Sequence, residues 1–278
     1  MKYITLHNGV RMPQFGLGTF KVEAGESAYE TVKRALKIGY RHIDTAIMYG
    51  NEADVAKAIK DSGIKREEIF VTSKFFKLYS GDKEKIRKDI DASLSRLDLG
   101  YVDLMLIHWP NMDEKINQAA WSVLEEYYEK GAFRAIGVSN FQIHHLERLL
   151  ESAKIVPMIN QVECHPLLAQ FGLQKYLISK GIQMTSYGPF AKGRVFEEPT
   201  ASEIKSIAEK HQATITQVII AWGLQRGIVM IPKSVHEDRL IENFNGTELV
   251  LSQSEMERMN ALNRGARVYT DPDNNAVT

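Results

Sequence analysis

The stretch VDLMLIH (102–108) is the clearest guide to the fold, because it is almost continuously apolar and rich in Val, Leu and Ile. A strand with one face in water alternates apolar and polar residues, whereas a near-continuous apolar run is typical of a parallel strand covered on both faces. The stretch therefore predicts a buried central strand, and His108 stands at its end.

Similar short runs recur on either side of this strand, separated by longer segments with helical periodicity. The expected strands are FGLG (15–18), RHID (41–44), IFVTSK (69–74), VDLMLIH (102–108), AIGVSN (135–140), INQVE (159–163), IQMTSY (182–187) and IVMIPK (228–233). The expected helices cover residues 26–38, 51–61, 83–97, 117–130, 142–151, 171–180 and 202–210. Strict alternation of strand and helix implies parallel strands joined by right-handed crossovers.

Eight such units in about 250 residues match a closed (β/α)8 TIM barrel better than an open doubly wound sheet. No linker rich in Gly, Ser or Pro divides the chain, so we expect one domain over residues 1–278. The segment YITLHNGVRMP (3–13) predicts an N-terminal β-hairpin that turns at Asn8-Gly9 and plugs the bottom of the barrel. Extra helices are expected towards the C-terminus, one of them over residues 212–226, between the last two strands.

The composition narrows the class of protein. Lys plus Arg and Asp plus Glu number 35 each, so the formal net charge is zero and nothing suggests a basic face for nucleic acid. The single cysteine, Cys164, excludes an internal disulfide and fits a reducing compartment. The N-terminus lacks an apolar signal core, and no run of about 18 apolar residues occurs. We therefore expect a cytoplasmic protein that does not enter a membrane.

The common nucleotide-binding loops do not occur. GLGTFK (16–21) has Gly16 and Gly18 but Lys21 where a dinucleotide fingerprint needs its third glycine, and no G-x-x-x-x-G-K-[ST] motif is present. These glycines are more simply explained by close packing near the barrel mouth.

Each of three consecutive expected strands ends in an ionisable residue. Asp44, Lys74 and His108 end strands two, three and four, and Tyr49 follows on the loop after strand two. Active sites of such barrels lie at the C-terminal ends of the strands, and adjacent strands lie within about 5 Å of each other. Each residue alone is also typical of a structural salt bridge, but together they predict an active site.

The chemistry of this set suits carbonyl reduction. A lysine ammonium near a phenol favours the phenolate, so we expect Lys74 to lower the pKa of Tyr49. Asp44 is expected to keep Lys74 protonated, and His108 to orient a carbonyl oxygen. Tyr49 would then be the general acid that protonates the oxygen while hydride reaches the carbon.

The later strands suggest a site for the hydride donor. Ser139, Asn140 and Gln161 offer hydroxyl and amide groups for a carboxamide, and Tyr187 is able to stack on a flat ring. After the last strand, Lys233, Ser234 and Arg239 precede or begin a helix, a common position for phosphate binding. Two cations exceed what a ribose diol needs and favour the 2′-phosphate of NADP, although Glu237 lies nearby and a solvated helix start remains an alternative.

No metal site is expected. His144 and His145 are neighbours on a helix, where adjacent residues do not share a face. ECHP (163–166) has one cysteine and one histidine without a second pair, which is a weak zinc pattern.

The sequence resembles the aldo-keto reductase family over essentially its whole length. The resemblance rests on GYRHIDTAIMYGNEADVAKAI (39–59), RAIGVSNF (134–141), IPKSVHEDRLIENF (231–244) and LHNGVRMPQFGLGTF (6–20). It implies a catalytic tetrad of Asp44, Tyr49, Lys74 and His108 in which the tyrosine is the proton donor. The implied NADP(H) site comprises Ser139, Asn140, Gln161, Tyr187, Lys233, Ser234, Arg239 and Asn243, with Asn243 near the adenine. GPFAKGR (188–194) resembles the family's loop over the pyrophosphate, which adds Gly188, Lys192 and Arg194.

The substrate side departs from the family pattern. Phe75-Phe76 follow Lys74 where Leu-Trp is frequent, and the segment after HWPN (108–111) is short. The resemblance to small bacterial-type reductases of 2,5-diketo-gluconate, methylglyoxal and other aldehydes implies a small carbonyl substrate. The short segment suggests an open pocket walled by Phe20, Phe76 and Trp109, although ordinary packing at the barrel mouth is an alternative for these aromatic residues. Family habit and neutral charge favour a monomer, and the polar tail TDPDNNAVT (270–278) is expected to be mobile.

Two other functions remain open from the sequence. Lys74 could form a Schiff base in a barrel aldolase, which requires a neutral amine in an apolar pocket. Reductase-like barrels also serve as non-catalytic, redox-sensing subunits.

Overall fold

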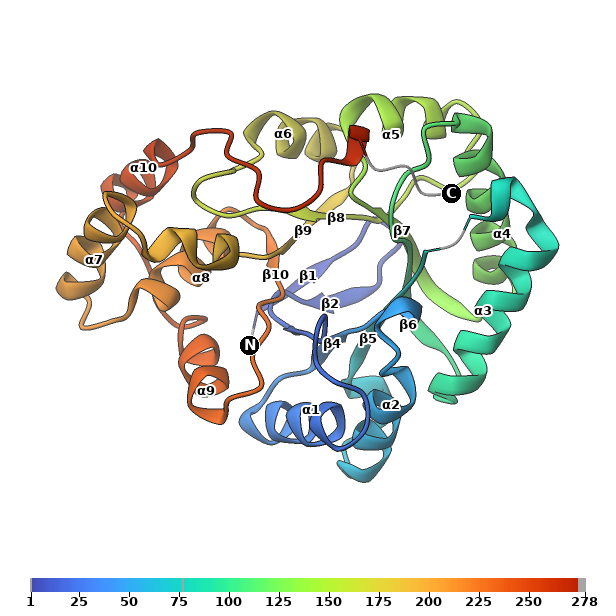
Figure 1. Ribbon diagram of the computed structural model, residues 1–278, viewed down its shortest axis with the longest axis horizontal. Helices are drawn as coiled ribbons and strands as arrows, with labels where there is room; N and C mark the ends of the chain where they lie inside the picture. Colours follow the sequence, from blue (N-terminus) through green and yellow to red (C-terminus); the bar gives the residue numbers. More distant parts are fainter. Residues whose placement is uncertain (1, 77, 275–278) are drawn as a thin grey trace.

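The computed structural model describes residues 2–76 and 78–274, and its centre is a parallel sheet of eight strands (Figure 1). The strands are β3 (Leu17–Gly18), β4 (His42–Asp44), β5 (Phe70–Phe75), β6 (Val102–Ile107), β7 (Phe133–Ser139), β8 (Ile159–Glu163), β9 (Gln183–Tyr187) and β10 (Val229–Met230). They pair in chain order, each parallel to the next. All residues of β5 and β6 are buried, as the apolar run 102–108 predicts. The eight predicted strands are therefore confirmed, although β3 and β10 are shorter than expected.

Backbone hydrogen bonds close the sheet into a barrel. The amide of Gly16 donates to the carbonyl of Met230 (2.9 Å), and the amide of Met230 donates to the carbonyl of Gln14 (3.0 Å). The amide of Gly18 donates to the carbonyl of Pro232 (3.1 Å). A Cβ at Gly18 would lie 2.9 Å from the carbonyl oxygen of Ile231, so this seam requires a residue without a side chain. The predicted (β/α)8 barrel is confirmed, and the glycines serve its closure.

Helices surround the barrel (Figure 1). They are α1 (Glu26–Ile38), α2 (Glu52–Asp61), α3 (Lys83–Leu97), α4 (Glu114–Glu129), α5 (Ile143–Leu150), α6 (Phe171–Ser179), α7 (Thr200–Lys210), α8 (Ile215–Gln225), α9 (Glu237–Asn245) and α10 (Gln253–Ala261). The 3-10 turns are η1 (Ile47–Tyr49), η2 (Arg66–Glu68), η3 (Tyr79–Gly81), η4 (Ala191–Phe196) and η5 (Pro272–Asn274). Over residues 2–76 and 78–274, no helix combines the length and apolarity that crossing a membrane requires.

Local signals explain several helix starts. Asp82 accepts hydrogen bonds from the amides of Glu84 and Lys85 at the start of α3, and Ser252 forms a capping box at the start of α10. The extra helix expected over residues 212–226 is present between the last two strands. The segment 212–226 forms α8, which packs on β10, whereas α7 packs on α8 and lies outside it (Figure 1). The helix outside the ring is thus α7, because the apolar sequence of α8 has to be covered on more than one side.

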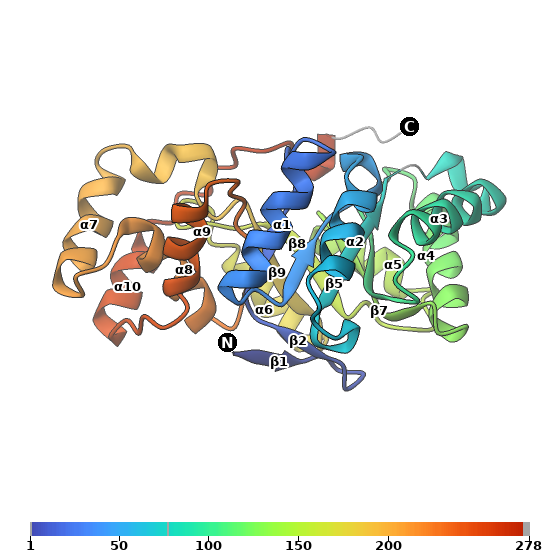
Figure 2. The ribbon, with the colours of Figure 1, turned by 90° about the horizontal axis from the view of Figure 1, so that it is seen from below.

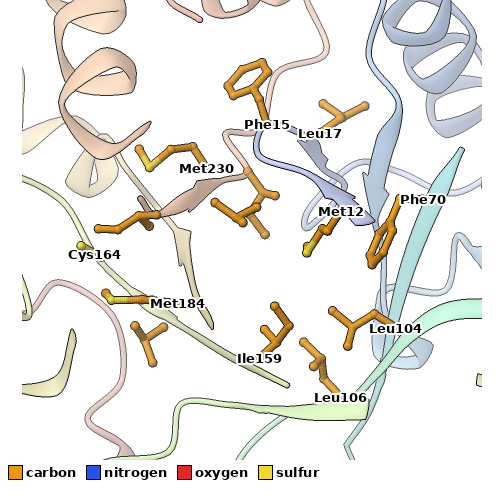
Figure 3. Close-up of a cluster of buried hydrophobic side chains, with 14 of the residues drawn as sticks. Met12, Phe15, Leu17, Phe70, Leu104, Leu106, Ile159, Cys164, Met184 and Met230 are labelled. Atoms are coloured by element: carbon orange, nitrogen blue, oxygen red, sulfur yellow. The ribbon is translucent and has the colours of Figure 1, made fainter. Parts of the chain in front are cut away.

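The N-terminal hairpin lies across the bottom of the barrel (Figure 2). Its strands β1 (Tyr3–Thr5) and β2 (Arg11–Pro13) are antiparallel and turn at Asn8-Gly9, with Gly9 at φ 86°. Asn8 donates a side-chain hydrogen bond to the carbonyl of Arg134 (2.9 Å) on β7. Met12 is fully buried in the same apolar cluster as the barrel residues Leu104 and Ile159 (Figure 3). The predicted plug is confirmed.

Met12→Ala tests how much the plug contributes to stability. Removing a fully buried methionine side chain from a packed core should lower the free energy of unfolding by about 2–5 kcal/mol. Urea unfolding followed by circular dichroism measures this change. Met112→Ala, at a residue 62% exposed, is the matched control and should change stability by less than about 0.5 kcal/mol. Equal effects of the two substitutions would show that the hairpin is not part of the core.

Candidate active site

The C-terminal ends of β4, β5 and β6 bring three ionisable groups to one mouth of the barrel. Asp44 ends β4, Lys74 is next to last in β5, and His108 follows β6 with its amide bonded to the carbonyl of Phe75 (2.9 Å). The turn η1 carries Tyr49 back over this mouth, and Gly50 at φ 69° ends the turn. The four residues that sequence reasoning selected are therefore neighbours in space.

Lys74 is the centre of the group, with a fully buried side chain. Its Nζ donates to Asp44 Oδ1 (2.5 Å), to the carbonyl of Thr45 (2.9 Å) and to the hydroxyl of Tyr49 (3.3 Å). An ammonium has three N–H donors, and these three acceptors account for all of them. The amine and the phenol are thus in direct contact.

Asp44 is held from the far side of the barrel as well. Gln161 on β8 donates its side-chain amide to Asp44 Oδ2 (2.8 Å), so each carboxylate oxygen has a partner. Burial raises the pKa of Asp44, and the charge and hydrogen bond of Lys74 oppose this rise. Burial likewise lowers the pKa of Lys74, and Asp44 opposes that fall. Each ion therefore keeps the other charged in a buried site.

Tyr49 differs from the sequence-based expectation. Burial raises its pKa well above the ordinary value of 10, and the negative charge of Asp44 raises it further. The expected lowering by Lys74 was wrong, because a carboxylate 2.5 Å from the ammonium leaves the pair with little net charge. Tyr49 is consequently a neutral phenol that carries its proton at physiological pH.

His108 completes the polar part of the mouth. Its ring centroid lies 5.6 Å from that of Tyr49 in an edge-to-face arrangement, and its side chain is almost fully buried. Burial and the nearby Lys74 hold the pKa of His108 well below its usual value. The imidazole is therefore neutral and offers one N–H donor.

Hydroxyl and amide groups form a row along the ends of β7, β8 and β9. Tyr187 donates its hydroxyl to Asn140 Oδ1 (2.7 Å), and Asn140 donates to the carbonyl of His108 (2.9 Å). Ser139 donates to the carbonyl of Gln161 (2.9 Å). Asn140 adopts φ 67°, a strained conformation that Asn tolerates better than most residues. The row joins the Asp44–Lys74 pair through Gln161, and its donors and acceptors match those of a primary carboxamide.

The predicted phosphate ligands lie at and just before the start of α9. Lys233 and Arg239 are exposed, whereas Ser234 and Asn243 are buried, and Ser234 Oγ accepts a hydrogen bond from the amide of His236 (3.1 Å). The first amides of a helix have no acceptor within it, so they suit an anion. Glu237 and Asp238 are also in this first turn, so two carboxylates partly offset the positive charge of Lys233 and Arg239.

The loop 188–194 is fixed by the C-terminal segment. Lys192 donates to the carbonyl of Val268 (2.8 Å), and its Nζ lies 4.4 Å from the ring centroid of Tyr269. Gly188 adopts φ 61°, and Arg194 is exposed on η4. Sequence reasoning missed residues 267–269 and treated the tail after them as mobile.

Aromatic side chains border the mouth. The ring centroid of Phe20 lies 5.2 Å from that of Tyr49, and Phe20 is 43% exposed. The ring of Phe76 meets the ring of His108 edge-to-face at 6.0 Å. Trp109 is half-buried and follows His108 directly. Met48 is 50% exposed beside Tyr49 and was not selected from the sequence.

His144, His145 and Asp273 form a cluster that sequence reasoning excluded. The two imidazole ring centroids lie 4.0 Å apart, and both Nε2 atoms are within 3.6 Å of Asp273 Oδ1, so the argument that neighbours face apart was wrong here. His145 Nδ1 accepts a hydrogen bond from the amide of Gln142 (3.1 Å). Its Nε2 therefore carries the proton in the neutral ring and is not free to bind a metal. The contacts instead attach part of the expected mobile tail to α5, while residues 275–278 lie outside the described residues.

Comparisons with known proteins agree with this architecture. The family model described as "Aldo/keto reductase family" matches residues 14–264. Glyoxal reductase of Bacillus subtilis (strain 168) is 48% identical over 270 residues, which span 97% of this chain and 96% of that protein.

Two solved structures are similar along almost the whole chain. MGS-M4, an aldo-keto reductase enzyme from a Medee basin deep-sea metagenome library, shares 42% identity with a TM-score of 0.93 over 98% of this chain and 99% of its own. A mutant of Gox0644 in complex with NADPH shares 36% identity with a TM-score of 0.90 over 99% and 98% of the two chains. Both the family model and the identity of these relatives show that the chain belongs to the aldo/keto reductase family.

Proposed function

We propose that this protein reduces the carbonyl group of small aldehydes and ketones with NADPH, and that Tyr49 protonates the carbonyl oxygen. The observation that carries the proposal is the contact of Lys74 Nζ with both Asp44 (2.5 Å) and the hydroxyl of Tyr49 (3.3 Å). A neutral phenol with an ammonium beside its oxygen is suited to give up a proton as negative charge develops on a carbonyl.

The chain's residues have distinct parts in this proton transfer. Tyr49 holds the proton, and Lys74 stabilises the phenolate that remains when the proton has left. Asp44 keeps Lys74 charged and fixed in direction, and Gln161 fixes Asp44. His108, neutral beside Tyr49, offers an N–H to the substrate oxygen and so places the carbonyl near the phenol.

NADPH fits the donor set that borders these residues, and it would supply the hydride. Ser139, Asn140 and Gln161 would hold its carboxamide, and Tyr187 would face its ring. Lys233, Ser234, Arg239 and the first amides of α9 would hold the 2′-phosphate, with Asn243 near the adenine. Gly188, Lys192 and Arg194 would border the pyrophosphate. The complex of the similar Gox0644 mutant with NADPH supports this assignment.

The substrate we propose is a short aldehyde or 1,2-dicarbonyl compound. Phe20, Phe76 and Trp109 would supply apolar walls, and the exposure of Phe20 leaves the mouth open. A small dicarbonyl has little apolar surface, so its binding would rest on the polar groups of Tyr49 and His108. The name of the glyoxal reductase, 48% identical, favours this class.

The aldolase alternative requires a neutral Lys74 with a free lone pair. In this structure all three N–H groups of Lys74 have acceptors, and one acceptor is a carboxylate, which favours the ammonium. Borohydride treatment with a keto substrate, followed by mass spectrometry, should give no adduct on Lys74. A non-catalytic redox-sensing role would be supported only if NADPH bound and no carbonyl compound were turned over.

Tyr49→Phe tests the proton donor. It removes one hydroxyl and keeps the ring, so NADPH affinity should be retained while kcat falls by about 10²–10⁴-fold. NADPH binding is measured by fluorescence, and turnover by NADPH absorbance with glyoxal-type substrates. Tyr29→Phe, which removes an exposed hydroxyl bonded to Asp61, is the control and should keep full activity. Near wild-type turnover in Tyr49→Phe would refute the mechanism.

The pH dependence tests the raised pKa of Tyr49. A donor whose pKa is well above 10 stays protonated, so kcat/KM for reduction of a slow substrate should be flat between about pH 6 and pH 9. Alcohol oxidation needs the deprotonated phenol and should rise with pH over the same range. A reductive rate that falls steadily above pH 7 would mean that the pKa of Tyr49 is lowered instead.

Arg239→Met tests the choice between NADPH and NADH. Loss of one charge-assisted hydrogen bond to the 2′-phosphate should raise the Kd of NADPH about 10- to 100-fold and leave that of NADH unchanged. Fluorescence titration with both cofactors measures the two constants. Arg148→Met, at an exposed arginine on α5, should change neither. A parallel loss for both cofactors would place Arg239 elsewhere than at the 2′-phosphate.

A further inference from the structure

Glu163 is a buried carboxylate that the proposed chemistry does not use. It ends β8 within the ECHP segment, and its side chain is fully buried. It accepts hydrogen bonds from His165 Nε2 (3.0 Å), the amide of Val268 (2.7 Å) and the guanidinium of Arg267 (3.3 Å). The amide of Tyr269 also donates to it, at 3.3 Å. Burial alone would raise the pKa of Glu163, but the bonds from His165 and Val268 hold it below its usual value.

Most of these donors belong to one short segment, Arg267–Tyr269, which we call the strap. It is part of the chain that leaves α10 and passes above the carboxyl ends of the strands towards α5 (Figure 1). The strap has no helix or strand of its own. Two of its backbone amides and one of its side chains bind the same carboxylate, so Glu163 anchors it at a single point.

The other side of the strap meets the proposed cofactor residues. The carbonyl of Val268 accepts a hydrogen bond from Lys192 (2.8 Å), and the ring of Tyr269 lies under the same ammonium. The ring of Tyr269 also meets that of Tyr187 edge-to-face at a centroid distance of 5.3 Å. A Cβ at Gly188 would lie 2.5 Å from Tyr269 Cε2, so this ring packs directly on the backbone of the loop 188–194.

These contacts order a side chain that would otherwise be free. A lysine side chain loses rotamer entropy when it is immobilised, and a ligand that has to order it binds more weakly for that reason. One N–H of Lys192 is bound to the strap, which leaves two for an anion. The strap therefore holds the ammonium in place before a phosphate arrives.

We propose that Glu163 is a positioning residue for cofactor retention, which acts through the strap on Lys192. This inference rests on the proposed use of NADPH. Loss of the Glu163 charge loosens the strap, frees Lys192 and accelerates NADPH dissociation. The bound cofactor is thus retained by a residue in the ECHP segment as well as by its direct ligands.

A double-mutant cycle tests the proposal with NADPH as the ligand. Glu163→Gln alone should accelerate NADPH dissociation and raise its Kd about three- to tenfold. Lys192→Met should weaken binding by at least as much. The double variant should be scarcely weaker than Lys192→Met, because Glu163 acts through Lys192. In combination with Arg239→Met, on the separate helix α9, the effect of Glu163→Gln should be fully retained.

A matched variant separates positioning from stability. Glu125 is also a buried glutamate that accepts two backbone amides, those of Lys154 and Ile155, and none of these groups contacts the strap. Glu125→Gln should lower the melting temperature and leave NADPH dissociation unchanged. If Glu163→Gln does not fold, Tyr269→Leu replaces it in the cycle, since it removes the ring contacts and keeps the backbone bond to Glu163.

The outcomes are distinguishable. Additive effects of the Glu163 and Lys192 substitutions, or equal effects of Glu163→Gln and Glu125→Gln on dissociation, would overturn the positioning role and leave the proposed reduction intact. A wild-type protein that binds no NADPH would overturn both proposals, and the wild-type titration alone reveals this.

Discussion

The ion pair between Lys74 and Asp44 is the constraint on which the site depends. Two opposite charges buried at the barrel mouth are costly to desolvate, and removal of either partner leaves the other uncompensated. The barrel meets this cost by giving every polar atom of the pair a partner, from Thr45 and Tyr49 near the pair to Gln161 on the opposite side. The closed sheet is thus a condition for the chemistry, because only closure brings β8 opposite β4 and β5.

The same pair explains why Tyr49 keeps its proton. An isolated ammonium would favour the phenolate, but a carboxylate at 2.5 Å nearly cancels its field, and burial then determines the direction of the pKa shift. The neutral phenol therefore carries its proton throughout the physiological pH range. Lys74 would thereby act mainly late in the reaction, when negative charge appears on the oxygen of Tyr49.

A second buried carboxylate organises the opposite edge of the mouth. Glu163 binds backbone amides of a segment without regular secondary structure and so gives it a fixed position. Loops are usually ordered by their own turns or by packing, and here the C-terminal segment is ordered by charge-assisted hydrogen bonds. Glu163 holds the strap directly, whereas Asp44 reaches the turn η1 through Lys74, which donates to the hydroxyl of Tyr49.

Periodicity in the sequence was sufficient for the architecture. The apolar run 102–108 and its counterparts predicted all eight strands, and α1 and α3 have the predicted bounds. Strands and helices could be predicted because their hydrophobic periodicity is visible within short stretches of sequence. The selection of Asp44, Lys74 and His108 followed from the same logic, since the ends of parallel strands share one edge. The sequence did not show that α8 packs on the sheet and α7 on α8, because this depends on which apolar face finds a partner.

Only the tertiary structure decided the electrostatics and the role of the tail. The link from Gln161 to Asp44 joins positions 117 residues apart, and the link from Glu163 to Val268 joins positions 105 residues apart. Neither contact produces a pattern that is visible within a short stretch of sequence. The direction of the Tyr49 pKa shift depends on distances of a few ångströms between charges from different strands and on the burial of these groups. Both are determined only when the barrel has closed.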